Sequence, residues 1–379
     1  MKDKEIYFNV PYFSGREVDY IKDAVSTGKI SGNGKYTIKC QDFFQKRYGF
    51  NKCLLTTSCT DALEMAAILL DIKEGDEVIA PSYTFVSTVN AFVLRGAKIV
   101  FVDSHNDHPG IDEDAIESLI TSKTKVIVPV HYAGVSCDMD KIMDIALKYN
   151  LFVVEDAAQA IDSYYISKDG TKKPLGSIGH LAAFSFHETK NIISGEGGML
   201  VVSDSQFIQR SEIIWEKGTN RSAFFKGEVD KYGWVDIGSS FLPSEIIAAF
   251  LWAQLENLDN IQKRRKEIWN SYYNGLELWA LKNNIELPKI ATNSTNNAHM
   301  FYLVCKDSDH RTALIKYLKS QNIYAVFHYL SLHKSSFYQD KHDMNRELVN
   351  SDQFSDCLIR LPFYYELDVD FVIKQIIQF

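Results

Sequence analysis

The stretch Lys125–Asp156, KVIVPVHYAGVSCDMDKIMDIALKYNLFVVED, holds two apolar runs separated by a helical segment. The runs are Lys125–Tyr132 and Leu151–Asp156, and between them Asp138–Tyr149 carries apolar residues at helical spacing. Nearly continuous apolar runs that end in polar residues are typical of strands buried on both faces. This order of strand, helix and strand predicts part of a parallel sheet that helices cover on both sides.

The same alternation continues on both sides of this stretch. Further strands are expected at Cys53–Thr57, Val78–Pro81, Lys98–Asp103, Leu181–Phe186 and Met199–Val202. Helices are expected between the earlier strands, at Thr60–Leu70, Ser87–Leu94 and Asp112–Ile120. The predicted fold class is therefore α/β, with a mostly parallel central sheet.

A long helical pattern follows, from about Ser244 to Leu278, and its length indicates a connector between two domains. Shorter elements beyond it predict a smaller α/β domain: His299–Cys305, His310–Ser320, Ile323–Tyr329 and a closing helix at Val369–Ile377. We therefore expect a large domain with an N-terminal arm at residues 1–243. The connector helix and the small C-terminal domain are expected at residues 244–379.

The composition limits the kinds of protein and partner. The chain has 379 residues, of which 46% are hydrophobic and 24% charged, as in an ordinary globular protein. Its net charge of −8 and the lack of a basic run argue against nucleic acid, and an anionic substrate would need a locally basic pocket. No segment suits a signal peptide or a membrane span, which needs about 18–20 apolar residues. Six cysteines without a CxxC pair predict reduced thiols in a cytoplasmic protein.

Polar residues follow four of the expected strands, and ligands of parallel α/β sheets bind at the carboxyl ends of strands. Thr57–Thr60 precedes a helix and offers hydroxyls and free N–H groups that suit a phosphate, although Ser and Thr also cap helices routinely. Glu155 and Asp156 end a buried strand. Two carboxylates at the end of a buried strand are costly unless at least one has a cationic partner. The alternative is that both are solvated.

The third strand end is Pro81–Phe85, whose aromatic side chains could cover a flat ligand or simply join the core. The fourth is Phe184–Leu200, FSFHETKNIISGEGGML, where Lys190 lies between an apolar segment and a cluster of glycines. A desolvated lysine has a lowered pKa and acts as a nucleophilic amine. Considered by itself, Lys190 would be interpreted as a solvated loop cation.

Together, the four strand ends fit one cofactor, pyridoxal phosphate. This cofactor needs a lysine for its Schiff base, an acid for its pyridinium nitrogen, a phosphate site and an aromatic cover. Lys190 is the predicted Schiff-base lysine and proton carrier, and Asp156 is predicted to keep the pyridine protonated. The other predicted contacts are Thr60 and Ser185 to the phosphate, Phe85 to the ring face and Gln159 to the ring hydroxyl.

Other motifs add little. The sequence has no GxGxxG and no GxxxxGK[ST], so the usual cradles for dinucleotides and nucleoside triphosphates are absent. His105–His108, HNDH, holds two possible metal ligands, but without a second ligand cluster a polar turn is the favoured interpretation. Pyridoxal phosphate chemistry requires no metal, and none is expected.

Four stretches resemble the DegT/DnrJ/EryC1/StrS family of sugar aminotransferases: TSCTDALEMA, PSYTFVSTVNAF, VEDAAQA and SFHETKNIISGEGGML. The resemblance runs from GKISGNGKYT near the N-terminus to VFHYLSLH near the C-terminus. It implies fold type I of the pyridoxal-phosphate enzymes, as in aspartate aminotransferase, with Lys190 as the Schiff-base lysine. It also implies a homodimer whose active sites lie at the subunit interface, and glutamate as the amino donor.

Within the family, four further stretches resemble enzymes that aminate C4 of dTDP-4-dehydro-6-deoxy-D-glucose: HYAGVSCDMD, EKGTNRSAFF, VDKYGWVDIGSSFL and NAHMFY. This implies dTDP-4-amino-4,6-dideoxy-D-galactose as the product, for enterobacterial common antigen or O-antigen. A gluco product or amination at C3 remains an alternative. Lys190 argues against the dehydratases of the family, in which histidine replaces this lysine. A non-catalytic sugar-nucleotide-binding module would need neither this lysine nor Asp156.

The sequence departs from the family at the phosphate site. Many relatives carry GxNxRM where this chain has GSSFLP at Gly238–Pro243, so Ser240 replaces the asparagine that reaches the neighbouring subunit's phosphate. Serine can donate the same hydrogen bond over a shorter reach. Cys59 replaces a commoner glycine and is expected to contribute its backbone N–H.

The substrate contacts are predicted from charge and position. Lys35, Lys217 and Arg221 are candidates for the substrate diphosphate, and each could equally be a solvated surface charge. His328 and Tyr329 are expected to face the sugar from the small domain. The alternative for His328 is a buried strand histidine that bonds to backbone groups.

Overall fold

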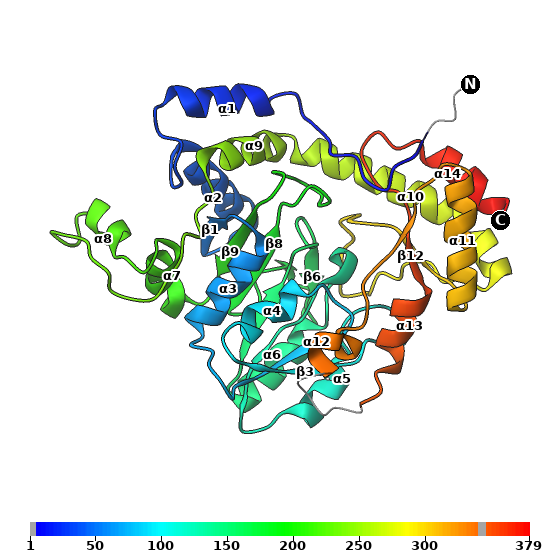
Figure 1. The fold of residues 1–379 in the computed structure, drawn as a ribbon, viewed down its shortest axis with the longest axis horizontal. Helices are drawn as coiled ribbons and strands as arrows, with labels where there is room; N and C mark the ends of the chain where they lie inside the picture. The colour runs from blue at the N-terminus through cyan, green and yellow to red at the C-terminus, as the bar shows by residue number, and fades with distance from the viewer. Residues whose placement is uncertain (1–4, 340–345) are drawn as a thin grey trace.

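The computed structural model describes residues 5–339 and 346–379, and its centre is a seven-stranded sheet (Figure 1). The strand order is β1-β9-β8-β5-β4-β2-β3. The strands are β1 (Lys52–Thr56), β2 (Glu77–Pro81), β3 (Lys98–Val102), β4 (Thr124–Ile127), β5 (Phe152–Asp156), β8 (Leu181–Ser185) and β9 (Gly198–Val202). β9 is antiparallel to β1 and β8, and the other four pairs are parallel. The mostly parallel α/β sheet is confirmed.

The helices that cover the sheet occupy the expected segments and some others. They are α2 (Lys35–Tyr48), α3 (Cys59–Leu69), α4 (Ser87–Val93), α5 (Glu113–Ile116), α6 (Met139–Tyr149) and α7 (Ile208–Trp215). The α6 helix begins where the Asp138 side chain accepts a hydrogen bond from the Lys141 N–H. It ends at Asn150, whose φ of 52° is left-handed, a conformation that terminates helices.

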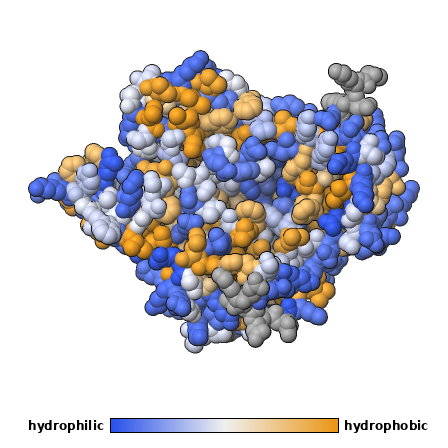
Figure 2. All heavy atoms as spheres, viewed as in Figure 1, coloured by the Kyte–Doolittle hydropathy of each residue, from blue (hydrophilic) through white to orange (hydrophobic). Residues whose placement is uncertain are grey.

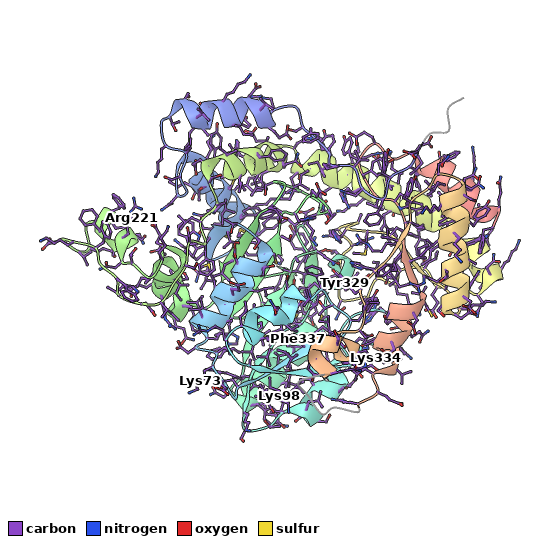
Figure 3. All side chains as sticks on the ribbon, viewed as in Figure 1. Lys73, Lys98, Arg221, Tyr329, Lys334 and Phe337 are labelled. Carbon is purple, nitrogen blue, oxygen red and sulfur yellow. The ribbon has the colours of Figure 1, made fainter. Side chains whose placement is uncertain are left out.

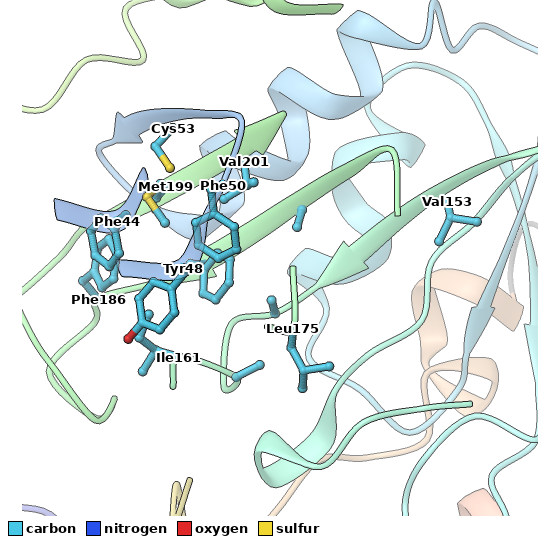
Figure 4. Packing of buried hydrophobic residues seen from close by; sticks show 14 of the residues in the cluster. Phe44, Tyr48, Phe50, Cys53, Val153, Ile161, Leu175, Phe186, Met199 and Val201 are labelled. Carbon is cyan, nitrogen blue, oxygen red and sulfur yellow. The ribbon is translucent and has the colours of Figure 1, made fainter. Parts of the chain in front are cut away.

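Successive residues of each strand face opposite sides, so the sheet separates two apolar clusters. On β9, Met199 and Val201 join the cluster beneath α2 and α6. Leu200 and Val202 join the cluster beneath α3, α4 and α7. Figure 4 shows Met199 and Val201 in the first of these clusters. Because both faces are apolar, polar chemistry is confined to the strand ends.

The strand predicted at Lys125–Tyr132 is shorter than expected, because β4 ends at Ile127. Pro129 has no N–H and cannot continue the ladder as a donor. The chain nevertheless stays beside its neighbours: the Val128 N–H donates to the Ile79 carbonyl at 2.8 Å, and the Asp156 N–H to the Pro129 carbonyl at 2.9 Å.

The connector consists of two helices, α9 (Glu245–Glu256) and α10 (Leu258–Asn283), so the prediction of one continuous helix was wrong. The break is at Asn257, whose ψ of 9° is not helical and whose side chain donates to the Tyr12 hydroxyl at 3.0 Å. The α9 helix packs on α1 (Glu17–Ser26) and α2, whereas α10 packs on α14 (Val369–Ile377) (Figure 1).

Glu245, the first residue of α9, also holds the start of α2. Its buried carboxylate accepts hydrogen bonds from the N–H groups of Gly34 (2.9 Å), Tyr36 (2.6 Å) and Thr37 (3.0 Å). A Cβ on Gly34 would lie 2.6 Å from the carboxyl carbon, so glycine permits this close approach. The division of the chain at residues 243/244 stays our proposal.

Beyond α10, a three-stranded antiparallel sheet has the order β10-β12-β11. Its strands are β10 (Tyr302–Val304), β11 (Val326–Phe327) and β12 (Leu358–Arg360), and the accompanying helices are α11 (Ser308–Ser320), α12 (Ser336–Gln339) and α13 (Val349–Cys357). The hairpin β6 (Tyr164–Ile166) with β7 (Lys172–Pro174) and the outlying α8 (Arg221–Phe225) complete the elements. In the part of the chain described, no helix is both long and apolar enough to cross a bilayer.

Candidate active site

A cavity of about 480 Å³ lies at the carboxyl ends of the central strands, where segments from residues 299–360 close over it. It brings together nine of the predicted site residues: Cys59, Thr60, Phe85, Asp156, Gln159, Ser185, Lys190, His328 and Tyr329. They come from segments far apart in the sequence. The sheet topology brings them together, as the argument from strand ends predicted.

Asp156 is held rigidly at the end of β5. Its side chain is 5% exposed, and it accepts hydrogen bonds from the Thr88 hydroxyl at 2.6 Å and from the Ala158 N–H at 3.1 Å. The Thr88 hydroxyl in turn lies 2.8 Å from the hydroxyl of Thr84, four residues earlier in the chain. The single hydroxyl proton of Thr88 is donated to Asp156, so in the Thr84–Thr88 hydrogen bond Thr84 is the donor. This chain of hydroxyls orients a carboxylate toward the cavity.

Lys190 lies in the turn between β8 and β9 and lines the same cavity. Burial lowers the pKa of its amine from 10.5 to about 8, while the nearby charges of Cys59 and Asp156 act to raise it and that of Arg360 to lower it. Among the described residues, no carboxylate forms a salt bridge with this amine. Lys190 is half-buried and lines the cavity, which favours the interpretation as the cofactor lysine over that as a solvated loop cation.

The start of α3 provides the predicted anion site. The Ser58 side chain caps the helix by accepting from the Asp61 N–H at 3.0 Å, so the alternative role of this segment as a helix cap is also realised. Within the described part of the chain, the N–H groups of Cys59 and Thr60 have no acceptor and remain available to a ligand. A Cβ at Gly198 would lie 2.3 Å from the Ser58 backbone, so this glycine lets β9 lie directly beneath the turn.

Aromatic and amide side chains form the opposite wall. Gln159 accepts from the Ala133 N–H at 2.6 Å and donates to the Tyr329 hydroxyl at 3.1 Å. The Tyr329 ring lies 6.0 Å from that of Phe85, which is 54% exposed at the cavity mouth. His328 is buried outside any strand, and its Nδ1 lies 2.7 Å from the Tyr132 hydroxyl.

Comparison with known proteins decides the family. The model of the DegT/DnrJ/EryC1/StrS aminotransferase family matches residues 11–378. The chain belongs to this family. It is 32% identical over 339 residues to GDP-perosamine synthase of Escherichia coli O157:H7, covering 88% of this chain and 86% of that protein. It is 29% identical over 383 residues to the UDP-4-amino-4-deoxy-L-arabinose–oxoglutarate aminotransferase of Shewanella sediminis, covering 97% and 96%.

Solved structures agree. Spr1654 of Streptococcus pneumoniae in its PLP form matches with a TM-score of 0.88 and 25% identity, covering 99% of this chain and 98% of that one. DesV of S. venezuelae matches with a TM-score of 0.87 and 27% identity, with the same coverage. The predicted fold type and the pyridoxal phosphate cofactor are confirmed. The protein is a sugar aminotransferase.

The cavity of this DegT-family aminotransferase fits its cofactor. Lys190 would hold the aldehyde carbon, Asp156 the ring nitrogen, and the first turn of α3 with Ser185 the phosphate. The charges of the cavity match those that the cofactor requires, since an unpaired amine, an ordered carboxylate and free N–H groups each face the cavity. The individual contacts remain our proposals.

The lowered pKa of Lys190 leads to a prediction about cofactor loading. We expect the cofactor-free aminotransferase to take up pyridoxal phosphate faster as the pH rises, with a midpoint near the lysine's pKa of about 8, because only the unprotonated amine attacks. The rate is followed by the change in cofactor absorbance, with N-α-acetyl-lysine as the reference amine. If the pH midpoint were the same for the protein and for N-α-acetyl-lysine, the pKa of Lys190 would not be lowered.

Glu155, next to Asp156, faces the protein interior and has a structural role. Its carboxylate is fully buried and accepts from the N–H groups of Gly176 (2.7 Å), Ile178 (2.8 Å) and Gly179 (2.6 Å), and from His131 Nε2 at 2.9 Å. Burial acts to raise the pKa of Glu155, but these hydrogen bonds outweigh it and hold the pKa below 4.5. The two adjacent acids therefore have different roles: Asp156 lines the cavity, and Glu155 holds a buried loop in place.

Replacing Glu155 by glutamine is expected to lower the free energy of unfolding by about 3 kcal/mol, because an amide NH₂ then faces backbone donors. The folded-state pKa of Glu155 lies below its usual value of 4.5, so its stabilisation is present above pH 4.5 and is lost on acidification. Urea unfolding between pH 4 and 7 measures the difference. A gap between wild type and variant that widens on acidification would contradict this account.

Four predicted contacts lie outside the cavity: Lys35, Lys217, Arg221 and Ser240. Lys35 pairs with Asp23 at 2.6 Å. Arg221 is the first residue of the outlying α8 and lies well away from Tyr329 (Figure 3). Its guanidinium lies 3.8 Å from the Glu216 carboxylate. Ser240 is exposed and forms a β-bridge with Glu216, so it lies close to Lys217 and Arg221. The contacts of the three cations to the substrate diphosphate, and of Ser240 to a neighbouring subunit's phosphate, stay predictions.

The cavity residues that were not predicted include Thr88, His299 and Arg360. Thr88 could have been found, because it follows Thr84 by four residues within PSYTFVSTVNAF. Arg360 is a lone charge within an apolar run, CLIRLPF, which is also a recognisable signal. His299 gives no such signal. Of the two possible metal ligands His105 and His108, His105 pairs with the Glu113 carboxylate at 2.6 Å, and no cluster among the described residues could hold a metal ion.

Proposed function

We propose that the protein transfers the amino group of glutamate to C4 of dTDP-4-dehydro-6-deoxy-D-glucose, giving dTDP-4-amino-4,6-dideoxy-D-galactose. The observation that carries the proposal is the meeting of Lys190 and Asp156 in one cavity. The name of the Shewanella relative supports a nucleotide-linked 4-amino sugar and the glutamate–oxoglutarate pair. The dTDP base and the galacto product rest on the sequence resemblance described above.

Bound pyridoxal phosphate supplies the carbonyl that carries the amino group and a ring that withdraws electrons. The protein supplies proton transfer and orientation. Lys190, whose pKa is lowered to about 8 by burial, passes readily between its charged and neutral forms at physiological pH and moves the proton at the substrate carbon. Asp156 is kept at the ring nitrogen by Thr88. His328, with its pKa lowered by burial and by the charges of Arg360 and Lys190, faces the acceptor as a neutral ring.

The proposal includes a cytoplasmic homodimer with shared active sites that serves enterobacterial common antigen or O-antigen synthesis. All six cysteines are free, which supports a reducing compartment. Figure 2 shows apolar side chains gathered over α1 and α9, where Val18 is 60%, Val25 55% and Ile246 39% exposed. An apolar surface of this kind suits a second subunit.

The test is incubation of the holoenzyme with glutamate and a panel of dTDP-, UDP- and GDP-linked keto sugars, followed by NMR of the product. We expect the dTDP 4-keto sugar to be used best and to give an axial C4 amine. An equatorial amine, amination at C3 or preference for another base would overturn the substrate assignment. None of these results would change the assignment of the chain to the sugar aminotransferase family.

A further inference from the structure

His299 is a buried histidine of the cavity, and one of its two ring nitrogens is free. The residue is 3% exposed and lines the cavity that Lys190 also lines. Its Nδ1 lies 2.7 Å from the side-chain oxygen of Asn191, the residue directly after Lys190. Within residues 5–339 and 346–379, its Nε2 has no hydrogen-bond partner, and this atom is not sealed from solvent. The Nε2 atom therefore opens on the cavity.

The hydrogen bonds of Asn191 determine where the proton of this ring lies. The Asn191 NH₂ group donates to the Asn297 carbonyl at 2.9 Å and to the side-chain oxygen of Gln262 at 2.9 Å. Because a backbone carbonyl only accepts, the NH₂ group lies on that side and the amide oxygen faces His299. His299 therefore donates from Nδ1, and Nε2 of the neutral ring is left as an acceptor.

Lys190 acts on this ring more strongly than any other charge. Burial is the largest cause of the lowered pKa of His299, and the charges that add to it are, in order, those of Lys190, Arg265, Arg360 and His328. Arg265 donates to the backbone carbonyl of His299 at 2.5 Å, yet its effect is smaller than that of Lys190. Because the interaction of charges falls with distance, the Lys190 amine lies close to the ring.

The backbone that presents His299 is held in an unfavourable conformation. Ala298 has a φ of 51°, in the left-handed region that residues with a Cβ avoid. Its N–H donates to the Asn296 side chain at 2.8 Å, and its carbonyl accepts from Arg265 Nε at 3.0 Å. Backbone strain of this kind persists only where the surrounding structure enforces it, and it gathers at functional sites. The fold therefore fixes the ring from the backbone as well as from Asn191.

We propose that His299 is a positioning residue for Lys190: its Nε2 accepts a hydrogen bond from the lysine amine whenever that amine is not bonded to the cofactor. The inference rests on the role proposed for Lys190 and does not depend on the sugar acceptor. A fixed acceptor keeps the freed amine directed into the cavity, where it must move a proton. Because the acceptor is neutral, it orients the amine without the large rise in pKa that a carboxylate would cause.

The other titratable groups around Lys190 stay in place when His299 is replaced. Cys59 and Asp156 act to raise the pKa of Lys190, and Arg360 acts to lower it. The remaining ones that line the cavity are His328, Tyr329 and the pair His187 and Glu196, which lie 3.7 Å apart. His299 itself is neutral, so it acts on the amine through a hydrogen bond and not through a charge.

The experiment measures how the reactivity of Lys190 depends on pH in the full-length protein freed of cofactor. Sulfosuccinimidyl acetate acetylates only the unprotonated amine, and mass spectrometry of the peptide that contains Lys190 gives the extent of reaction from pH 6 to 10. The wild type should show a midpoint near 8, the pKa to which burial lowers Lys190. His299→Asn can still donate to Asn191 but does not reach the position of Nε2. We expect its midpoint to fall by about one pH unit.

The direction of the shift separates this role from a merely structural one. A variant that only loosened the site would expose Lys190 further to water, and its pKa would rise toward 10.5. His299→Gln can place its amide oxygen at the position of Nε2 and should return the midpoint to within about 0.3 pH units of wild type. With holoenzyme and glutamate alone, His299→Asn should slow the single turnover about tenfold and change the apparent affinity for glutamate less than about threefold.

His333→Asn is the matched control. His333 is 8% exposed, its Nδ1 lies 2.7 Å from the Ser82 hydroxyl, and it does not line the cavity. The change should lower the melting temperature and leave the midpoint of Lys190 unchanged.

A midpoint of His299→Asn that equals or exceeds that of wild type would overturn the proposal. A wild-type midpoint equal to that of N-α-acetyl-lysine would instead count against the role proposed for Lys190 itself. Should His299→Asn not fold, ¹⁵N NMR of the histidine-labelled wild type decides. The proposal requires a neutral His299 ring with its proton on Nδ1, and a charged ring or a proton on Nε2 would overturn it.

Discussion

Replacing Lys190 by alanine is expected to lower kcat by at least about 10⁴-fold, the largest effect of any single change in this protein. The variant loses both the amine that holds the cofactor and the group that moves the proton. Burial lowers the pKa of Lys190 to about 8, which favours a reactive amine. Turnover with glutamate and the dTDP keto sugar measures the loss. Borohydride treatment of the wild type should also add the cofactor mass to the peptide that contains Lys190.

Lys282→Ala is the control for this substitution. Lys282 is exposed in the last turn of α10, and its removal should leave kcat within about twofold. Retention of most activity by Lys190→Ala, or attachment of the cofactor to another lysine, would refute the assignment of Lys190.

Replacing Asp156 by asparagine is expected to lower kcat by about 10²–10³-fold, since the change removes a preorganised charge beside the cofactor ring. Asparagine has nearly the same shape, and Thr88 can still donate to its oxygen. The loss therefore reports charge rather than packing. Steady-state kinetics and the cofactor absorbance spectrum measure it.

Thr88→Val provides the graded comparison for Asp156, because it removes the hydroxyl that orients the carboxylate and leaves the charge in place. We expect it to reduce kcat about tenfold, between wild type and Asp156→Asn. If Asp156→Asn kept kcat within threefold of wild type, the ring nitrogen would not depend on Asp156.

The central sheet could be predicted because burial on both faces leaves a direct mark on sequence. Runs such as Leu151–Asp156 admit few polar residues, and their polar ends locate the ligand. The three-residue strand β12 left no such mark, since its position depends on pairing with β10 and β11 from distant parts of the chain. The break at Asn257 was invisible for a similar reason, because its partner Tyr12 lies 245 residues away.

The residues of the active site also divide into those that leave a signal in the sequence and those that only the tertiary structure brings together. Residues at strand ends, including Lys190 and Asp156, could be inferred from the order of elements, whereas Arg360 is brought to the cavity by tertiary pairing. The predicted role of Ser240 involves a second subunit, which the sequence of one chain does not place. The sequence assigned Asp156 to the cofactor ring but left the role of Glu155 open. Strand alternation places them on opposite sides, but their partners come from distant segments: Thr88 of α4 for Asp156, and the loop at Gly176 for Glu155.

The buried carboxylate of Glu245 limits how the gene can be divided. A fragment that stops at residue 243 would lose the carboxylate that accepts from the N–H groups of Gly34, Tyr36 and Thr37, and water would replace it at the newly exposed start of α2. The apolar residues of α9 that pack beneath α2 would be lost as well. An independently expressed large domain would therefore need α9, either fused or supplied as a complementing peptide.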